Sequence, residues 1–172
     1  MLPLNILRGF NLIIDDDKNT FLEIEEMKLP VIGDETDDHS PGGSFMTIDV
    51  PLGIEKLEAA IKLRGMNPLV NGLIGEAPGK RRMFTAYQHI VDEEKGDEIQ
   101  RIVTMRGRLS KADPMANKRK DMAGYDYTIS NMALYEDIHD GAVIHRFNLF
   151  TNERTVNGVD INAGFNRNLA IR

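Results

Sequence analysis

Oxygen-bearing side chains near the N-terminus have the spacing of a calcium-binding loop. Positions one, three, five, eight and twelve of such a loop are held by Asp15, Asp17, Asn19, Leu22 and Glu26, an order that arranges oxygens around one cation. Position six needs glycine for its sharp turn, but here it is Thr20. The flanks are strand-like and no second loop follows, so we interpret these residues as an acidic turn. A small calcium-binding or enzyme domain is the remote alternative.

No other group of residues has the spacing of a catalytic or cofactor site. Residues 75–81 imitate a phosphate-binding loop, but the two glycines are one residue too close and Arg81 replaces the hydroxyl that would hold magnesium. The serines lack a nucleophile-elbow context. No zinc-binding spacing joins the four histidines, His39, His89, His139 and His145. We therefore predict no catalytic residue, no cofactor and no metal.

The composition predicts one domain over residues 1–172. A chain of 172 residues with 41% hydrophobic content can bury one core but little more. It has no cysteine, so disulfides and thiolate chemistry are excluded. No apolar run reaches the ~18 residues of a membrane helix, and no signal segment is recognisable at the N-terminus. We expect a soluble protein that is neither exported nor anchored in a membrane.

Charge is distributed unevenly along the chain. Residues 1–49 contain eleven acidic and three basic residues, a net charge of −8, whereas the whole chain carries −6. Basic side chains gather at Lys80–Arg82, at Arg106 with Arg108, and at Lys118–Lys120. These islands form no continuous basic stripe, which argues against tight binding to DNA. The two parts of the chain could instead attract each other between subunits.

Most of the chain has the pattern of β-strands. Phe10–Ile14 and a run from Phe21 to Ile32 predict a first hairpin, and residues 83–91, 99–109 and 125–135 predict three further strands. Asp140-Gly141 is a strong hairpin signal, because both turn positions must tolerate positive φ. It should pair residues 135–139 with 142–147. Residues 54–63 fit a helix and a strand equally well.

Residues 33–47, which we call the acidic arm, are polar and poor in core residues. A loop of about this length without secondary structure of its own is usually functional or disordered. Its acids have too few apolar neighbours to fold alone, so we predict that it is mobile in the monomer and orders against an adjacent subunit. The residues on which this prediction depends are Asp34, Glu35, Asp37, Asp38, His39, Pro41, Gly42 and Gly43.

A series of short motifs, in their order and spacing, carries a family resemblance. The most informative stretch is C-terminal, with Asn157, Gly158, Val159 and Asp160 at its start. Before it come Asn11–Asp15, Met27–Pro30, Pro41–Gly43, Ile48–Gly53 and Arg106–Arg108. Together these motifs resemble the major tail tube protein of contractile-tailed bacteriophages. The resemblance covers nearly the whole chain.

The resemblance implies a structural protein with no enzymatic activity. It implies a mainly-β fold of two packed antiparallel sheets with one short helix, in which residues 68–74 are the helix, capped by Asn67, and the later part of 54–63 is a strand. Subunits would form hexameric rings whose inner sheets join into one barrel, and the rings would stack into a tube. The implied partners are the tail sheath outside, and the tape measure protein and then DNA inside.

The implied location is the virion tail, with assembly in the host cytoplasm. The same fold serves DNA-free, bacteriocin-like contractile particles, which are the close alternative. A negatively charged lumen would repel passing phosphates, and alternate residues of the second and later strands are candidates to line it. The chain departs from the family in two loops: residues 113–124 lack the family's tryptophan, and Pro41–Gly43 lacks the arginine and the aromatic residue that the family has near this loop. The predicted acceptors for the acidic arm on another subunit are Arg81, Arg82, Lys118, Arg119 and Lys120.

Overall fold

The computed structural model describes residues 3–120 and 122–171. Within these residues, 55% of the chain is strand and two helices are short. The mainly-β prediction is confirmed, with one more helix than expected. In chain order the elements are β1 (Asn5–Ile14), β2 (Lys18–Asn19), β3 (Ile24–Lys28), β4 (Asp34–His39), β5 (Ile48–Ile54), β6 (Ala59–Arg64), α1 (Pro68–Asn71), β7 (Arg82–Asp92), β8 (Glu98–Pro114), β9 (Gly124–His139), β10 (Ala142–Asn148), β11 (Glu153–Val156), β12 (Val159–Asp160) and α2 (Ala163–Asn168).

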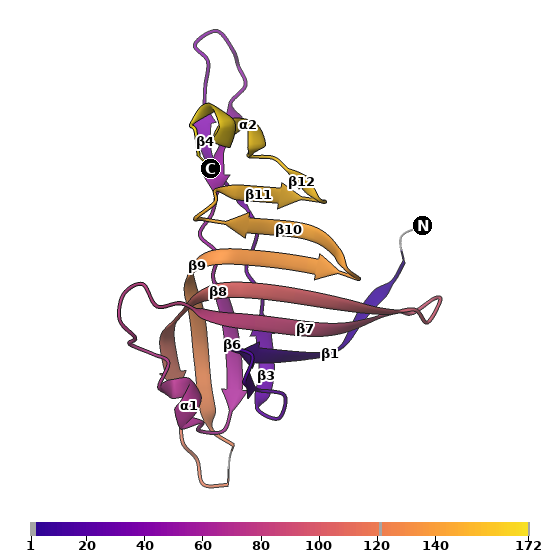
Figure 1. The fold of residues 1–172 in the computed structure, drawn as a ribbon, viewed down its shortest axis with the longest axis vertical. Coiled ribbons are helices and arrows are strands. Elements are labelled where there is room, and N and C mark those ends of the chain that lie inside the picture. The colour runs from indigo at the N-terminus through magenta and orange to yellow at the C-terminus, as the bar shows by residue number, and fades with distance from the viewer. Residues whose placement is uncertain (1–2, 121, 172) are drawn as a thin grey trace.

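Ten strands form one antiparallel sheet that bends into two layers (Figure 1). The first layer has the order β12-β11-β10-β9-β8-β7-β1-β2, and its strands lie across the view. In the second layer β3 pairs with β6, and β6 pairs with the first half of β9. β8 and β9 belong to both layers, and the register between them shifts twice between Arg106 and Lys111. Such bulges bend strands, so the two packed layers are halves of one continuous sheet.

The core lies between the two layers. Leu12 and Phe84 point inward from the first layer, Ile61 and Tyr127 point inward from the second, and all four are at most 2% exposed. Inward positions alternate along each strand, because successive side chains of a strand point to opposite faces. Each fully buried apolar side chain contributes about 1.5–3 kcal/mol. Val70 of α1 extends this core at the end where the helix lies.

The predictions for the middle and the end of the chain are confirmed. β7, β8 and β9 are the three expected strands, and a turn at residues 93–95 joins the first two. Asp140 and Gly141 adopt φ values of 46° and 78°. β10 therefore folds back on β9, with Phe147 opposite Tyr135. This geometry is the type I′ turn that matches the twist of a two-residue hairpin.

The ambiguous segment before α1 is a strand in its later part. β6 covers residues 59–64, and the Asn67 side chain accepts a hydrogen bond of 3.0 Å from the backbone N–H of Leu69. Pro68 occupies the first turn, where its missing N–H costs nothing. The helix ends at Asn71, earlier than the predicted Ile74, because the N–H groups of Leu73 and Ile74 bond to carbonyls three residues back, those of Val70 and Asn71, instead of four.

The predicted first hairpin is wrong. β1 pairs with the two-residue β2 through Ile13 and Ile14, and β3 pairs instead with β6 in the other layer. Thr20 causes the redirection: it is buried, and both its backbone N–H and its hydroxyl donate to the carbonyl of Leu12, at 3.0 and 2.9 Å. The chain is held against the end of β1 and then crosses to the second layer.

Candidate assembly surfaces

The acidic arm is the first strand and the tip of a β-hairpin, although its composition had suggested a loop without its own structure. β4 pairs with β5, from Asp34 opposite Ile54 to His39 opposite Ile48, in a separate two-stranded sheet. Every residue of β4 is exposed. In Figure 1 the hairpin projects past α2 at one end of the molecule. We call residues 33–54 the arm hairpin and this end the arm end. The mobility of the acidic arm in the monomer stays a prediction.

Like charges face each other along the arm hairpin. Asp38 lies directly opposite Asp49, and Glu35 and Asp37 are exposed beside them. Like charges opposite each other destabilise a strand pair. Among the described residues only Asp34 of the arm hairpin has an ion pair, 2.9 Å from its Oδ1 to Nη2 of Arg154 on β11. The remaining carboxylates of the arm hairpin are exposed, and none of them pairs with a cation in the part of the chain that the structure describes.

The tip of the arm hairpin is held by its own polar groups. The carbonyl of Pro41 accepts from the N–H of Ser44 at 3.0 Å, and the hydroxyls of Ser40 and Thr47 lie 2.8 Å apart. Gly42 and Gly43 form the turn, but neither has a positive φ, so their backbone conformation does not require glycine. The side chains at this tip are free to contact another molecule.

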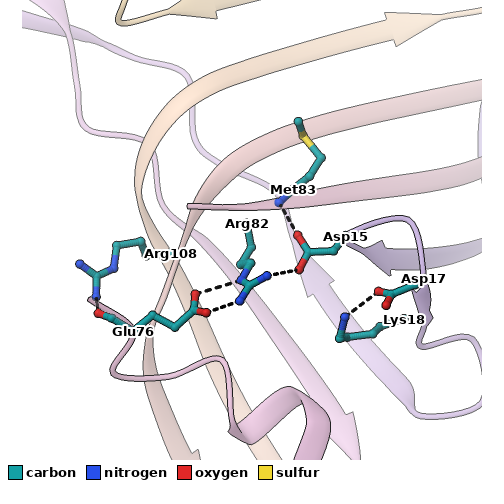
Figure 2. Close-up of polar contacts among 7 residues, drawn as sticks. All are labelled: Asp15, Asp17, Lys18, Glu76, Arg82, Met83 and Arg108. Atoms are coloured by element: carbon teal, nitrogen blue, oxygen red, sulfur yellow. Dashed lines mark hydrogen bonds and ion pairs between the residues drawn. The ribbon is translucent and has the colours of Figure 1, made fainter. Parts of the chain in front are cut away.

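Arg82 and its neighbours form a closed polar cluster (Figure 2). Its guanidinium pairs with the carboxylate of Glu76 through two bonds and with Oδ2 of Asp15 at 3.0 Å, while Oδ1 of Asp15 accepts from the N–H of Met83. Arg108 donates to the carbonyl of Glu76. The bond to Arg82 lowers the pKa of Glu76, and the bond to Glu76 raises the pKa of Arg82. Arg82 is therefore a poor acceptor for the acidic arm.

The other predicted acceptors are more available. Arg81 donates to the backbone carbonyl and side chain of Asn131, at 3.2 and 3.1 Å, and stacks 5.5 Å from the ring centroid of Phe150. Lys118, Arg119 and Lys120 are exposed in the loop between β8 and β9, and none of them has an ion pair within the described part of the chain. This loop lies at the opposite end of the molecule from the arm hairpin in Figure 1.

The C-terminal motif ends the first layer of the sheet. Asn157 and Gly158 adopt φ values of 49° and 78°, so they form a tight turn between β11 and β12. Val156 lies opposite Val159. The carboxylate of Asp160 accepts from the N–H of Asn162 at 2.9 Å, just before α2. Asn-Gly is the same hairpin signal as Asp-Gly, and it could have predicted this turn from the sequence.

Both edges of the first layer carry open backbone groups. At one edge β2 covers only Ile13 and Ile14, and no described strand pairs with residues 5–11 on that side. At the other edge lies the two-residue β12. An open edge strand is a template for pairing with another chain unless charges or covering segments block it.

One charged network was not predicted from the sequence. Asp137 is only 3% exposed, and it accepts from Nε and Nη2 of Arg101 at 2.9 and 2.7 Å. Arg101 also donates to Gln88, and His139 lies 3.4 Å from Asp137. Burial raises the pKa of the adjacent Tyr135 to about 12. The sequence did contain a signal for this network, because charged residues stand at positions of β8 and β9 that the alternation of apolar residues assigns to the core side.

The residues with calcium-loop spacing are used for other contacts. Asp15 bonds to Arg82 and Asp17 to Lys18, and the Lys18 bond lowers the pKa of Asp17. In the described residues no three His, Asp or Glu side chains are placed to hold a metal. None of the helices in the described ranges is long and apolar enough to cross a membrane.

The family model for phage tail tube protein FII matches residues 4–169. The chain belongs to this family. A search of curated proteins found no relative that matches. Tail tube proteins are structural and not enzymatic. Family membership implies self-assembly into a tube and a location in the virion tail.

Proposed function

We propose that this tail tube protein forms hexameric rings that stack into a hollow tube, with the tail sheath outside. The lumen would hold the tape measure protein first and conduct the genome into the host afterwards, and assembly would take place in the host cytoplasm. The observation that supports this proposal best is the pair of open sheet edges, β1 and β12, on opposite sides of one layer. Two different edges can join head to tail, and such heterologous contacts close into rings.

The sheet face turned away from the core is the proposed lumen wall, because α1 and the β3–β6 layer cover the other face. Thr85, Thr104 and Glu136 lie in register on this outer face. Glu136 is paired with Arg146 of β10, at 2.7 Å from Nε to Oε1. The strands themselves therefore offer a charge-compensated wall, and a negative lumen would need acids from the loops.

The acidic arm is the proposed clasp between subunits, with Lys118, Arg119 and Lys120 of another copy as its acceptors. Each exposed ion pair is worth about 0.2–1 kcal/mol. Two pairs for each of six copies would add roughly 2–12 kcal/mol per ring. Pairs of this kind are screened by salt, so assembly should weaken as ionic strength rises.

The test is charge reversal followed by sedimentation and electron microscopy. The native protein should be a monomer when dilute and form rings or tubes when concentrated. Asp37→Lys with Asp38→Lys should leave the monomer folded and abolish tubes, whereas Glu94→Lys with Glu98→Lys, an equal charge change at another exposed site, should not. Adding Lys118→Glu and Lys120→Glu to the arm variant should restore assembly. Normal tubes from the arm variant, or loss of tubes in the control, would reject the clasp.

A further inference from the structure

The tip of the arm hairpin carries exposed apolar side chains. Phe45 is fully exposed and Met46 is 65% exposed, at the end of a hairpin whose stem is acidic. An isolated exposed apolar residue is common, but aromatic residues, Phe among them, are enriched in the buried cores of protein–protein interfaces. Burying Phe45 against a partner would remove its ring from water and fix the position of the hairpin.

A group of exposed apolar side chains lies at the opposite end of the molecule. We call this group the foot, and its members are Phe21, Leu22, Met66, Leu69 and Met122, each between 59% and 79% exposed. Three separate segments supply them: the loop before β3, the connection from β6 together with α1, and the loop before β9.

Hydrogen bonds tie these three segments together. The N–H of Arg64 donates to the carbonyl of Glu23 at 2.7 Å, and the Asn67 side chain donates to the Glu23 carboxylate at 3.2 Å. The N–H of Gly65 donates to the carbonyl of Ala123 at 2.9 Å. These bonds hold the three segments of the foot next to one another, and the loop before β9 also carries Lys118–Lys120.

We propose that Phe45 and Met46 of one copy dock on the foot of a second copy. The two surfaces are both apolar, and their surroundings are opposite in charge, because the stem of the arm hairpin is acidic and the loop beside the foot is basic. They lie at opposite ends in Figure 1, so one copy cannot satisfy its own contact. This contact rests on the proposed assembly and gives it a second, apolar component that salt does not screen.

A competing place for Phe45 exists at the arm end itself. A groove of about 620 Å³ lies between β5, β9, β10 and α2, with Leu52, Leu149 and Phe165 in its wall. Its wall contains two acids, Glu55 and Glu153, and two bases, Lys56 and Arg154, so its formal charges cancel, whereas the loop beside the foot presents three adjacent cations, Lys118–Lys120, to an acidic stem. Charge therefore favours the foot over this groove.

Cysteine pairs distinguish the two places, since the chain has no cysteine of its own. Phe45→Cys with Leu69→Cys should give disulfide-linked chains in concentrated protein under mild oxidation. Phe45→Cys with Leu149→Cys, which tests the groove, should give no more than Phe45→Cys alone. Linking through Leu149 without linking through Leu69 would overturn the inference. The inference would also be overturned if neither the Leu69 pair nor the Leu149 pair cross-linked.

The assembly concentration measures the strength of the contact. Phe45→Ser should raise the midpoint concentration for tube formation about tenfold or more, the change expected for losing one buried aromatic side chain per contact. The midpoint concentration of Phe45→Ser should depend on salt as that of the native protein does. The charge-reversed arm variant should lose this salt dependence. Tubes at the native concentration from Phe45→Ser would overturn the inference and leave the charged clasp intact. If the native chain forms no tubes, the proposed function fails, and the cysteine pairs still decide the contact.

Discussion

Replacing Asp137 with asparagine should destabilise the subunit more than breaking any exposed ion pair. Asp137 is 3% exposed and both of its oxygens accept from the guanidinium of Arg101, at 2.9 and 2.7 Å. Asparagine would leave that guanidinium without its counter-charge between strands. Removing one partner of a buried pair costs about 3–5 kcal/mol. Because the Arg101 side chain is still 25% exposed, we expect about 2–4 kcal/mol.

The assay is thermal or denaturant unfolding of the dilute monomer. A loss of this size should lower the midpoint temperature by about 4–16 °C, at 2–4 °C per kcal/mol for a chain of this length. The matched control is Glu93→Gln, which breaks the pair with Arg8, where both side chains are about half exposed. It should cost less than about 1 kcal/mol.

A double substitution separates the missing charge from the missing packing. Arg101→Met with Asp137→Leu removes both charges and fills the same space with apolar groups, which often restores stability. It should recover most of the loss caused by Asp137→Asn. If the unfolding free energy of Asp137→Asn lies within about 0.5 kcal/mol of the native value, the ion pair is solvated and the reasoning from its burial is refuted.

Three further outcomes follow from particular contacts. Gly124→Ala should unfold the protein or prevent its folding, because a Cβ would lie 1.9 Å from a carbonyl oxygen of the neighbouring strand, while Gly9→Ala, with open space around it, should be tolerated in thermal unfolding. Arg82 lowers the pKa of Glu76, so the ionised Glu76 stabilises the folded subunit above the ordinary glutamate pKa, and this contribution is lost as pH falls through the lowered pKa. Glu76→Gln should therefore flatten the acid dependence of the unfolding free energy. Calorimetry should find no micromolar calcium affinity, because Asp15 is already bonded to Arg82; such an affinity, lost in Asp15→Ala, would contradict this.

Local signals predicted the parts of the fold that depend on neighbouring residues. Asp140-Gly141 determined its hairpin because the turn requires two residues that tolerate positive φ. The helix α1 was expected from the family resemblance, and its start at Asn67 and Pro68 agrees with a local cap and a preset φ. The long strands β7, β8 and β9 followed from apolar alternation. Each of these features is decided within a few residues of the chain.

Features that depend on distant partners were not predictable in the same way. β3 follows β1 in the sequence with a turn-like segment between them, yet it pairs with β6, because buried Thr20 redirects the chain. Arg82 belongs to an exposed-looking basic run, but Glu76 and Asp15 occupy its guanidinium. β4 has almost no strand propensity, and β5 supplies the pairing that its own residues do not favour.

The positions of the complementary surfaces add a constraint on the assembly. In Figure 1 the arm hairpin lies beyond the β12 edge, and the foot lies beyond the β1 edge. A copy that pairs its β12 edge with the β1 edge of a neighbour therefore points its arm hairpin toward that neighbour's foot. Under the proposed assembly one contact satisfies both pairs of surfaces, and ring closure depends on the arm hairpin. The charge-reversed arm variant should accordingly sediment as monomers. Free, unstacked rings from that variant would show that the sheet edges join without the arm hairpin, which would then act only between rings.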